Sequence, residues 1–183
     1  MDVLTAIDSR ASATRLAAPA PPTEDLDRIL RAGARAPDHG RLAPWRFVVL
    51  EGAGLEQLAD AMARAKRHAV PDSTEAELEV ERSKAMRAPM IVAVAARLNP
   101  THKVPEIEQI LAVGAAVQNM ILTARALGYG TMWKTGNAAY SPIVKQALGL
   151  DPADGIVAFL YLGTALSEGL PREPALEGRV SRP

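Results

Sequence analysis

The segment Arg10-Ala11-Ser12 near the amino terminus combines two side chains that bind anions. A guanidinium and a hydroxyl stand two positions apart, and together they offer hydrogen-bond donors to a phosphate group. An exposed arginine at a helix end explains Arg10, taken alone, about as well. The segment therefore indicates an anion-binding site only if other residues of the chain also bind the same ligand.

A second polar segment follows the helix that is predicted to begin at Thr23. Arg35 and His39 flank Pro37, and because proline ends a helix, both side chains can face one crevice. A surface charge at Arg35 and a loop hydrogen bond at His39 fit the same spacing. Trp45 begins an apolar run, where the sequence favours packing in the core over contact with a ligand.

Thr131, Met132 and Trp133 follow the turn formed by residues 128–130. A short extended segment after a Gly-x-Gly turn can present backbone N–H and C=O groups to a planar ring, with an apolar side chain as a wall. A core position explains Trp133 equally well, and solvent exposure is the simpler account of Lys134. These residues are the third candidate group for ligand binding.

Other catalytic chemistries find little support. The three histidines, His39, His68 and His102, lack the spacing of a helical zinc site, so no metal is expected. The chain has no cysteine, which excludes thiol nucleophiles and disulfides. The glycines of residues 128–130 end a helix where a dinucleotide loop would open one, and neither a nucleophile elbow nor a P-loop occurs.

Composition predicts an ordinary soluble protein with a single domain over residues 1–183. Hydrophobic residues make up 48% of the chain and charged residues 23%. Lys plus Arg and Asp plus Glu number 21 each, so no net positive field favours nucleic acid or a membrane surface. The start lacks the pattern of a secretory signal and no apolar run approaches about 20 residues, so a cytoplasmic location is expected.

Alternating helical and strand-like patterns must position the candidate residues. The predicted helices include a short one near residues 4–7 and others at 23–36, 55–68, 106–127 and from 142 to 149. The predicted strands cover residues 45–50, 90–95, 131–134 and 156–162. Thr23 and Ser141 are expected to cap their helices, and the strand at 45–50 is expected to be central in the sheet.

Three further segments are distinctive. Residues 74–86 are rich in charge and predict a mobile, exposed helical excursion. The helix at 106–127 is apolar on nearly every side, which predicts a buried helix that forms a dimer seam. From about residue 164 the chain is rich in Pro, Gly, Arg and Glu, which predicts a tail that is irregular or packed on a partner subunit.

Four segments, in order along the chain, resemble the FMN-dependent nitroreductase family. They are Ser9-Arg10-Ala11-Ser12 with Arg15, the run from Arg31 to Phe47 with its Ala-Pro and Pro-Trp pairs, Leu127 to Trp133, and Phe159 to Gly163. As an ordered set they cover the chain to about residue 165. The length and the Asp38-His39 pair are most similar to short bacterial NAD(P)H nitroreductases.

This resemblance implies a fold, a cofactor and a reaction. The fold is α+β, a three-layer α/β/α sandwich with a central mixed, mainly antiparallel sheet, in a homodimer that holds FMN at the subunit interface. The implied reaction is ping-pong transfer from NADH or NADPH to a nitroaromatic or quinone, with hydride transfer carried by flavin N5 and no catalytic side chain. The implied flavin ligands are Arg10, Ala11, Ser12, Thr131, Met132 and Trp133, with Arg35 and His39 reaching the flavin of the partner subunit.

The chain departs from the family pattern in two places. Asp38, Arg41 and Ala43 stand where many members have Ser, Asn and Gln, so the preferred substrate stays open. The basic residue that completes the phosphate site has no clear counterpart, although Arg172 and Arg179 are candidates. Alternatives are a flavin-binding or sensor protein with little reductase activity, flavin destruction or dehalogenation, and a non-catalytic dimeric scaffold.

Overall fold

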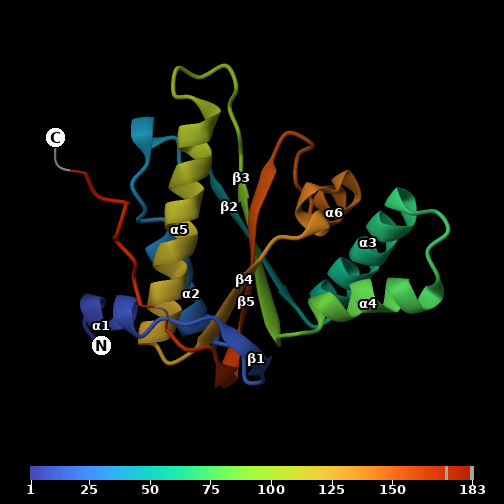
Figure 1. Ribbon diagram of the computed structural model, residues 1–183. Coiled ribbons are helices and arrows are strands. Elements are labelled where there is room, and N and C mark those ends of the chain that lie inside the picture. Colours follow the sequence, from blue (N-terminus) through green and yellow to red (C-terminus); the bar gives the residue numbers. More distant parts are fainter. Residues whose placement is uncertain (172, 182–183) are drawn as a thin grey trace.

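The computed structural model describes residues 1–171 and 173–181, and it shows one sheet between two layers of helices (Figure 1). Helices α2 and α5 cover one face, and α3, α4 and α6 cover the other. The elements in chain order are α1 (Val3–Asp8), β1 (Ala13–Ala17), α2 (Thr23–Gly33), a 3-10 turn (His39–Arg41), β2 (Trp45–Glu51), α3 (Ala53–Ala69), α4 (Glu75–Ala85), β3 (Met90–Ala96), α5 (Glu106–Ala126), β4 (Gly130–Lys134), a 3-10 turn (Asn137–Tyr140), α6 (Pro142–Ala147) and β5 (Gly155–Glu168). The expected α+β sandwich is confirmed, and all the strand pairings in the described residues are antiparallel.

Strand β5 organises the sheet because it pairs with three other strands. The strand order is β1-β5-β3-β2, and β4 also pairs with β5. Along β5, β4 pairs from Phe159 to Gly163 and β1 pairs from Thr164 to Glu168. Strands β1 and β4 therefore follow one another along the edge of β5 that faces away from β3.

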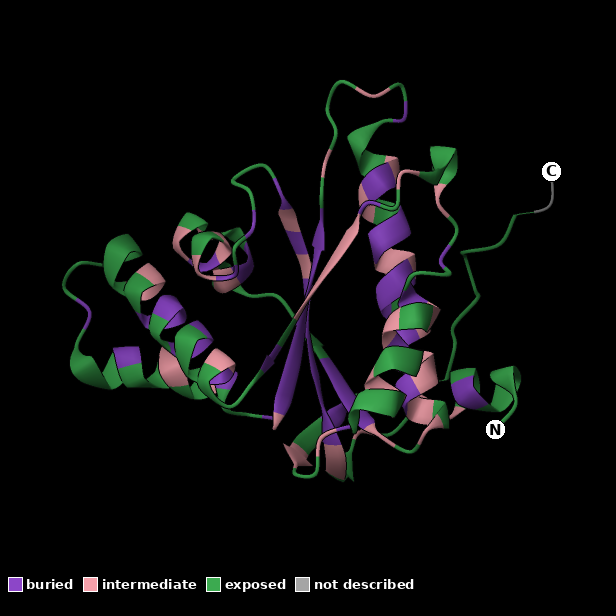
Figure 2. Cartoon of the chain, turned by 180° about the vertical axis from the view of Figure 1, so that it is seen from behind, coloured by how far each residue is buried: buried purple, intermediate pink, exposed green. Residues whose placement is uncertain are grey.

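Residues of β3 alternate between two hydrophobic cores, which explains why its sequence is apolar throughout. Figure 2 shows this strand buried along its length. Met90, Val92, Val94 and Ala96 belong to the core under α2 and α5, and Ile91, Ala93 and Ala95 belong to the core under α3 and α6. A strand covered on both faces needs no polar side, so its pattern is a continuous run.

Two strand predictions were wrong. Strand β2 lies at the edge of the sheet, with β3 as its only partner among the described pairings, and was expected to be central. Its apolar run arises because residues on both of its faces pack against the cores while most stay partly exposed. Strand β5 extends to Glu168, so regular structure continues past residue 164, because β1 supplies a partner that the sequence did not predict.

The helix ends also differ from expectation. Pro22 occupies the N-cap position of α2 and Thr23 lies in the first turn, with no side-chain cap bond. Helix α2 ends at Gly33, before Pro37. Ser141 does cap α6 by position, followed by Pro142, but its hydroxyl makes no cap bond. Proline with its fixed φ suits an N-terminal boundary and needs no hydroxyl there.

Helix α5 combines length with low polarity. In the described residues, α5 is the one helix that is long and apolar enough to cross a bilayer. The sequence analysis did not identify an apolar run of this length, because charged residues lie near the ends of the helix. In the fold, its buried side is one wall of the core and includes Val113, Val117 and Met120. This packing is that of a core helix.

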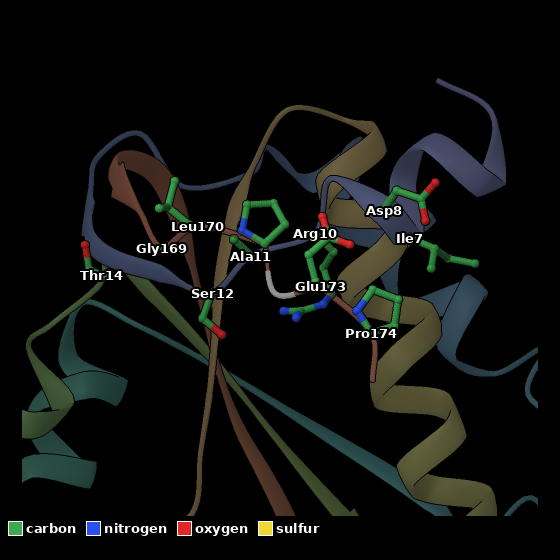
Figure 3. Close-up of a pocket in the computed structure, with 11 residues that line it drawn as sticks. Ile7, Asp8, Arg10, Ala11, Ser12, Thr14, Gly169, Leu170, Glu173 and Pro174 are labelled. Atoms are coloured by element: carbon green, nitrogen blue, oxygen red, sulfur yellow. The ribbon is translucent and has the colours of Figure 1, made fainter. Parts of the chain in front are cut away.

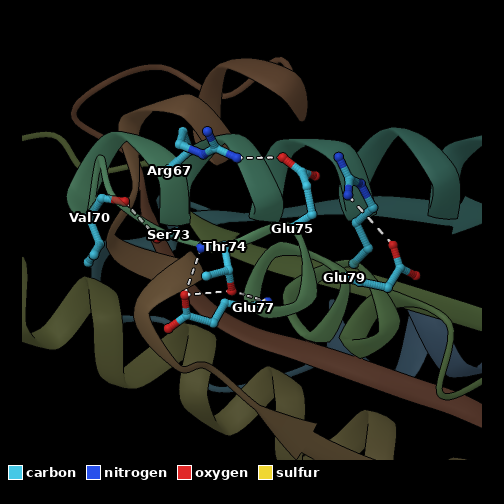
Figure 4. Close-up of polar contacts among 8 residues, drawn as sticks. Arg67, Val70, Ser73, Thr74, Glu75, Glu77 and Glu79 are labelled. Atoms are coloured by element: carbon cyan, nitrogen blue, oxygen red, sulfur yellow. Dashed lines mark hydrogen bonds and ion pairs between the residues drawn. The ribbon is translucent and has the colours of Figure 1, made fainter.

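The charged segment at 74–86 forms α4, which packs on α3 through Leu78 and Ala85. Thr74 begins the helix with a capping box, in which its hydroxyl accepts from the Glu77 N–H at 3.3 Å and the Glu77 carboxylate accepts from the Thr74 N–H at 2.8 Å (Figure 4). The Thr74 N–H, and after it the Thr74 hydroxyl at 3.0 Å, donate to the Glu77 carboxylate and hold the pKa of Glu77 below its ordinary value. Arg67 of α3 binds Glu75 at 2.6 Å and fixes the turn between the helices.

Candidate functional site

Two adjoining pockets lie along the edge formed by β1 and β4, and they share Ser12 and Thr14. The first, about 920 Å³, lies between the end of α1, the start of β1 and the tail after β5 (Figure 3). The second, about 670 Å³, runs along β1 and β4 and is closed by the turn before β3. We call the first the amino-end pocket, with Arg10 as its main cation, and the second the strand-edge pocket.

Short-range contacts hold the Arg10–Ser12 segment in place. Ser9 follows the end of helix α1, and its N–H and hydroxyl both donate to the carbonyl of Thr5, at 3.0 and 2.6 Å. Arg125, at the carboxyl end of α5, donates to the Ser9 hydroxyl at 3.4 Å and to both carboxylate oxygens of Glu168 at 2.7 and 2.8 Å. The segment is thus clamped between the ends of α1, α5 and β5.

The amino-end pocket contains all three residues that the sequence predicted there. Arg10 is half-buried, Ala11 is buried and Ser12 is exposed. The N–H of Gly169 donates to the carbonyl of Ser12 at 3.0 Å, which holds the tail against the segment. Asp8 and Glu173 also line the pocket, so among the described residues two carboxylates stand beside one guanidinium.

The strand-edge pocket presents the backbone of β4. The described pairings join β4 to β5 alone, so the other edge of β4 keeps free backbone donors and acceptors. Met132 and Trp133 line the pocket. Thr131 is buried within the sheet and lines neither pocket. Trp133 is 40% exposed and donates its indole N–H to the carbonyl of Val157 at 3.1 Å, so it forms a fixed wall rather than a core residue.

Two residues of this pocket were missed by the sequence analysis. Met86 and Arg87 come from the turn between α4 and β3 and line the strand-edge pocket opposite Trp133. The sequence assigned both to the exposed excursion, and no local pattern marks the turn as part of a site. Together with Arg15 and Lys134 from the adjoining strands, Arg87 makes three cations around the pocket.

Arg35 and His39 lie elsewhere in the chain. Nδ1 of His39 is 2.5 Å from Oε2 of Glu108, on the first turn of α5, and the two residues line a separate pocket of about 310 Å³. Arg35 is exposed and lines none of the pockets found in the described residues. The structure therefore does not bring Arg35 and His39 into one pocket. Glu108 and Arg125 are about 25 Å apart along α5, so His39 and the Arg10–Ser12 segment form two groups at opposite ends of this helix.

The loop that carries His39 has an unusual backbone. Gly40, Arg41 and Ala43 all have positive φ, at 78°, 54° and 48°. The Asp38 carboxylate accepts from the Ala43 N–H at 2.6 Å and closes the loop. Positive φ at residues other than glycine costs free energy, so the contacts around this loop must hold it in place.

The remaining candidates fall outside both pockets. Trp45 is half-buried, packs against the core under α5 and lines no pocket in the described chain, which supports its role in packing. Arg179 is not among the residues that line the amino-end pocket, and it donates to the carbonyl of Ala175 at 2.7 Å. Arg172 lies outside the described residues.

Comparisons with known proteins agree on one family. A sequence model described as "Nitroreductase family" matches residues 7–164. The chain is 43% identical over 164 residues to "Putative NAD(P)H nitroreductase YdjA" of Escherichia coli K12, which covers 90% of this chain and 88% of that protein. It is 37% identical over 169 residues to a "Putative NAD(P)H nitroreductase" of Haemophilus influenzae, covering 92% and 91%. A crystal structure of a nitroreductase in complex with FMN from Desulfovibrio desulfuricans matches with a TM-score of 0.76 at 28% identity, over 100% of this chain and 98% of that one.

Proposed function

Because the chain belongs to the nitroreductase family of flavin oxidoreductases, we propose that it binds FMN and transfers reducing equivalents from NADH or NADPH to a small acceptor. Nitroaromatics and quinones are the acceptor classes expected in vitro. The observation that carries the proposal is the continuity between the amino-end pocket and the strand-edge pocket through Ser12 and Thr14.

The residues of the two pockets fit the parts of FMN. Arg10, Ser12 and the backbone at Ala11 would hold the phosphate end, because a dianion needs donors and positive charge. The free edge of β4 at Thr131–Trp133 would bind the ring through backbone groups, with the indole of Trp133 as a wall. The two pocket volumes, about 920 and 670 Å³, are ample for a ligand of this size.

The side chains of the protein would bind and orient FMN and stabilise the charge that forms on reduction, and they would not react themselves. Bound FMN would supply the redox chemistry, because flavin N5 can take a hydride from the nicotinamide and the reduced ring can pass two electrons to the acceptor in a ping-pong exchange. A nitro group then gains two electrons and two protons and loses one oxygen as water. Arg15, Arg87 and Lys134 would stabilise the negative charge that reduction places in the strand-edge pocket. No side chain is required as a nucleophile.

A homodimer would join the two groups of candidate residues. The outer face of α5 carries exposed apolar residues, with Ile107 at 61% and Leu111 at 63% exposure, and continues through the small Ala115. Such a stripe favours association. If α5 packs antiparallel on its copy about a two-fold axis, the amino end of one helix meets the carboxyl end of the other. Arg35 and His39 would then reach the flavin of the partner subunit.

The tail and the cellular location are part of the same proposal. Leu170 in the tail is 91% exposed, as expected if residues after β5 pack on a partner subunit. We also propose that the chain forms a single domain, that it has no nucleic-acid or membrane partner, and that it is located in the cytoplasm.

The first test is the absorption spectrum of the purified protein after FMN is added and excess is removed. We expect a bound flavin band that NADH or NADPH bleaches without oxygen and that a nitroaromatic or quinone restores. Arg10→Ala should weaken FMN binding about 10- to 100-fold, because a charged hydrogen bond is worth roughly 1.5–3 kcal/mol. Arg64→Ala, an exposed arginine of α3 that lines none of the pockets found in the described residues, is the control.

The outcomes separate the alternatives. Failure of the wild-type protein to bind FMN contradicts the proposal and favours a non-catalytic scaffold. A stable flavin band that neither nicotinamide coenzyme bleaches favours a flavin-binding or sensor protein. Equal FMN affinity in Arg10→Ala and Arg64→Ala removes Arg10 from the site.

A further inference from the structure

The strand-edge pocket carries more positive charge than any other pocket in the described residues. Arg15, Arg87 and Lys134 line it, and no described acidic residue does. None of the three is in an ion pair or donates a side-chain hydrogen bond within the described chain. Their charges are therefore available to a ligand.

Carboxylates offset two of the cations that line the other pockets. Lys84, in the pocket between α3 and α4, is paired with Glu81 at 2.5 Å. Arg10, in the amino-end pocket, shares the lining with Asp8 and Glu173. Lys66 also lines the pocket between α3 and α4 and has no ion pair within the described residues, so that pocket keeps a smaller excess. The largest excess of positive charge among the described pockets is in the strand-edge pocket, where the proposed flavin ring lies.

The same pocket offers apolar surface of the right kind for an aromatic ligand. Met86 is 55% exposed and Trp133 is 40% exposed, and both line it. An indole and a thioether side chain both make favourable contacts with aromatic rings. Because the indole N–H is already bonded to Val157, Trp133 offers its ring rather than a hydrogen-bond donor.

We propose that this pocket selects aromatic electron acceptors that carry a negative charge, with an aromatic carboxylate as the type ligand; this inference rests on the flavin reductase function proposed above. A reduced flavin ring carries one negative charge, so three cations leave positive charge for a second anion. Arg87 is the selecting residue, because it comes from a turn outside the strands that hold the ring. Its position is independent of the segments that carry the flavin ligands.

The size of the preference follows from charge alone. One cation at about 6 Å from a ligand carboxylate changes the affinity of the pocket for that ligand by about tenfold. This value lies between the effect expected in bulk water and the larger effect expected at a protein surface that is partly shielded from water. Because the three cations are exposed, the preference must fall as salt rises and screens them.

The experiment compares ligands of one shape and different charge. Benzoate and benzamide are titrated by calorimetry into FMN-loaded protein, and turnover is measured with 4-nitrobenzoate and 4-nitrobenzamide. We expect the wild-type protein to prefer the anion of each pair by about tenfold at low salt. Arg87→Gln should abolish most of this preference, Arg87→Lys should retain it, and Arg64→Gln should leave it unchanged.

The results that overturn the inference are distinct from failure of the proposed function. Equal binding of benzoate and benzamide, or a preference that Arg87→Gln leaves intact, overturns it while the flavin band and its reduction by NADH still stand. A change in Arg87→Gln that affects both acceptors equally, together with a shifted flavin potential, also overturns it, because Arg87 would then serve the cofactor alone. If the wild-type protein binds no FMN, the proposed function itself has failed.

Discussion

Replacement of Gly163 by alanine tests how closely the strands around the site are packed. Gly163 lies in β5 opposite Gly130 of β4, where β5 passes from one partner strand to the next. A Cβ atom at this position would lie 2.7 Å from Cδ of Pro89 and 2.8 Å from the carbonyl oxygen of Ala17 in β1. Neither neighbour can rotate away, since one is a backbone oxygen and the other a proline ring.

The expected cost can be estimated from these contacts. Extra volume in a packed interior costs typically 1–3 kcal/mol, and a backbone neighbour puts this site at the upper end, about 2–3 kcal/mol. For a chain of this size, that corresponds to a fall in Tm of about 4–12 °C. Gly155→Ala is the matched control in the same strand, because a Cβ atom there meets nothing within 4 Å.

Guanidinium unfolding followed by circular dichroism measures the effect, with all variants at one protomer concentration because assembly adds to stability. Gly163→Ala should also weaken FMN binding, since its strain pushes β1 away from β4 and widens the strand-edge pocket. The reasoning is refuted if Gly163→Ala and Gly155→Ala unfold within about 0.5 kcal/mol of each other, the range of an ordinary substitution.

Three further predictions follow from single contacts. Glu108→Ala should weaken FMN binding to the assembled protein about two- to tenfold, because His39 loses the partner that orients it. Glu108→Gln should keep most of the affinity. Isothermal titration measures both variants, and equal losses of affinity would contradict this reasoning. Glu173→Gln should tighten FMN binding about two- to fivefold by removing a negative charge from the amino-end pocket, and unchanged or weaker binding would show that this carboxylate does not face the phosphate. The lowered pKa of Glu77 means that its capping box stabilises α4 above the ordinary glutamate pKa and is lost as pH falls through the lowered value. An NMR titration of the Glu77 amide should therefore have a lower midpoint in the wild-type protein than in Thr74→Ala, which keeps the N–H of residue 74 but lacks the hydroxyl. Equal midpoints would remove the Thr74 hydroxyl as a cause of the shift.

Elements with strong local patterns could be predicted from the sequence. Helices α3 and α5 and strand β3 were predicted within a few residues of their observed ends. The apolar residues of the two helices recur with the helical period of their buried sides, and β3 is a continuous apolar run because it is buried on both faces. Strand β1 was missed, since Ala13–Ala17 has no apolar run and becomes a strand only by pairing with the end of β5, about 150 residues away. The edge position of β2 is likewise a property of the whole sheet, which local sequence does not determine.

The site was predictable to the extent that its residues are contiguous. The Arg10–Ser12 segment and Thr131–Trp133 were identified by residue type and turn context, and the structure brings the two segments to one edge. Arg87 was not identified, because its approach depends on how the turn between α4 and β3 meets β4. Arg35 and His39 were expected to share a crevice, but the strained loop directs His39 towards Glu108 instead.

The position of the site follows from the way in which β5 changes partners. Three of the four segments that resemble the family lie in or directly before β1, β4 and β5, and they meet where β5 passes from β4 to β1. The outer edges of β1 and β4 have no described partner strand, so backbone donors and nearby side chains face one continuous opening. In the fourth segment, His39 binds Glu108 at the other end of α5 and cannot reach that opening within one chain. A flavin site that uses all four segments therefore requires a second copy of the chain, and a stable monomer that binds FMN with full affinity would mean that the fourth segment takes no part.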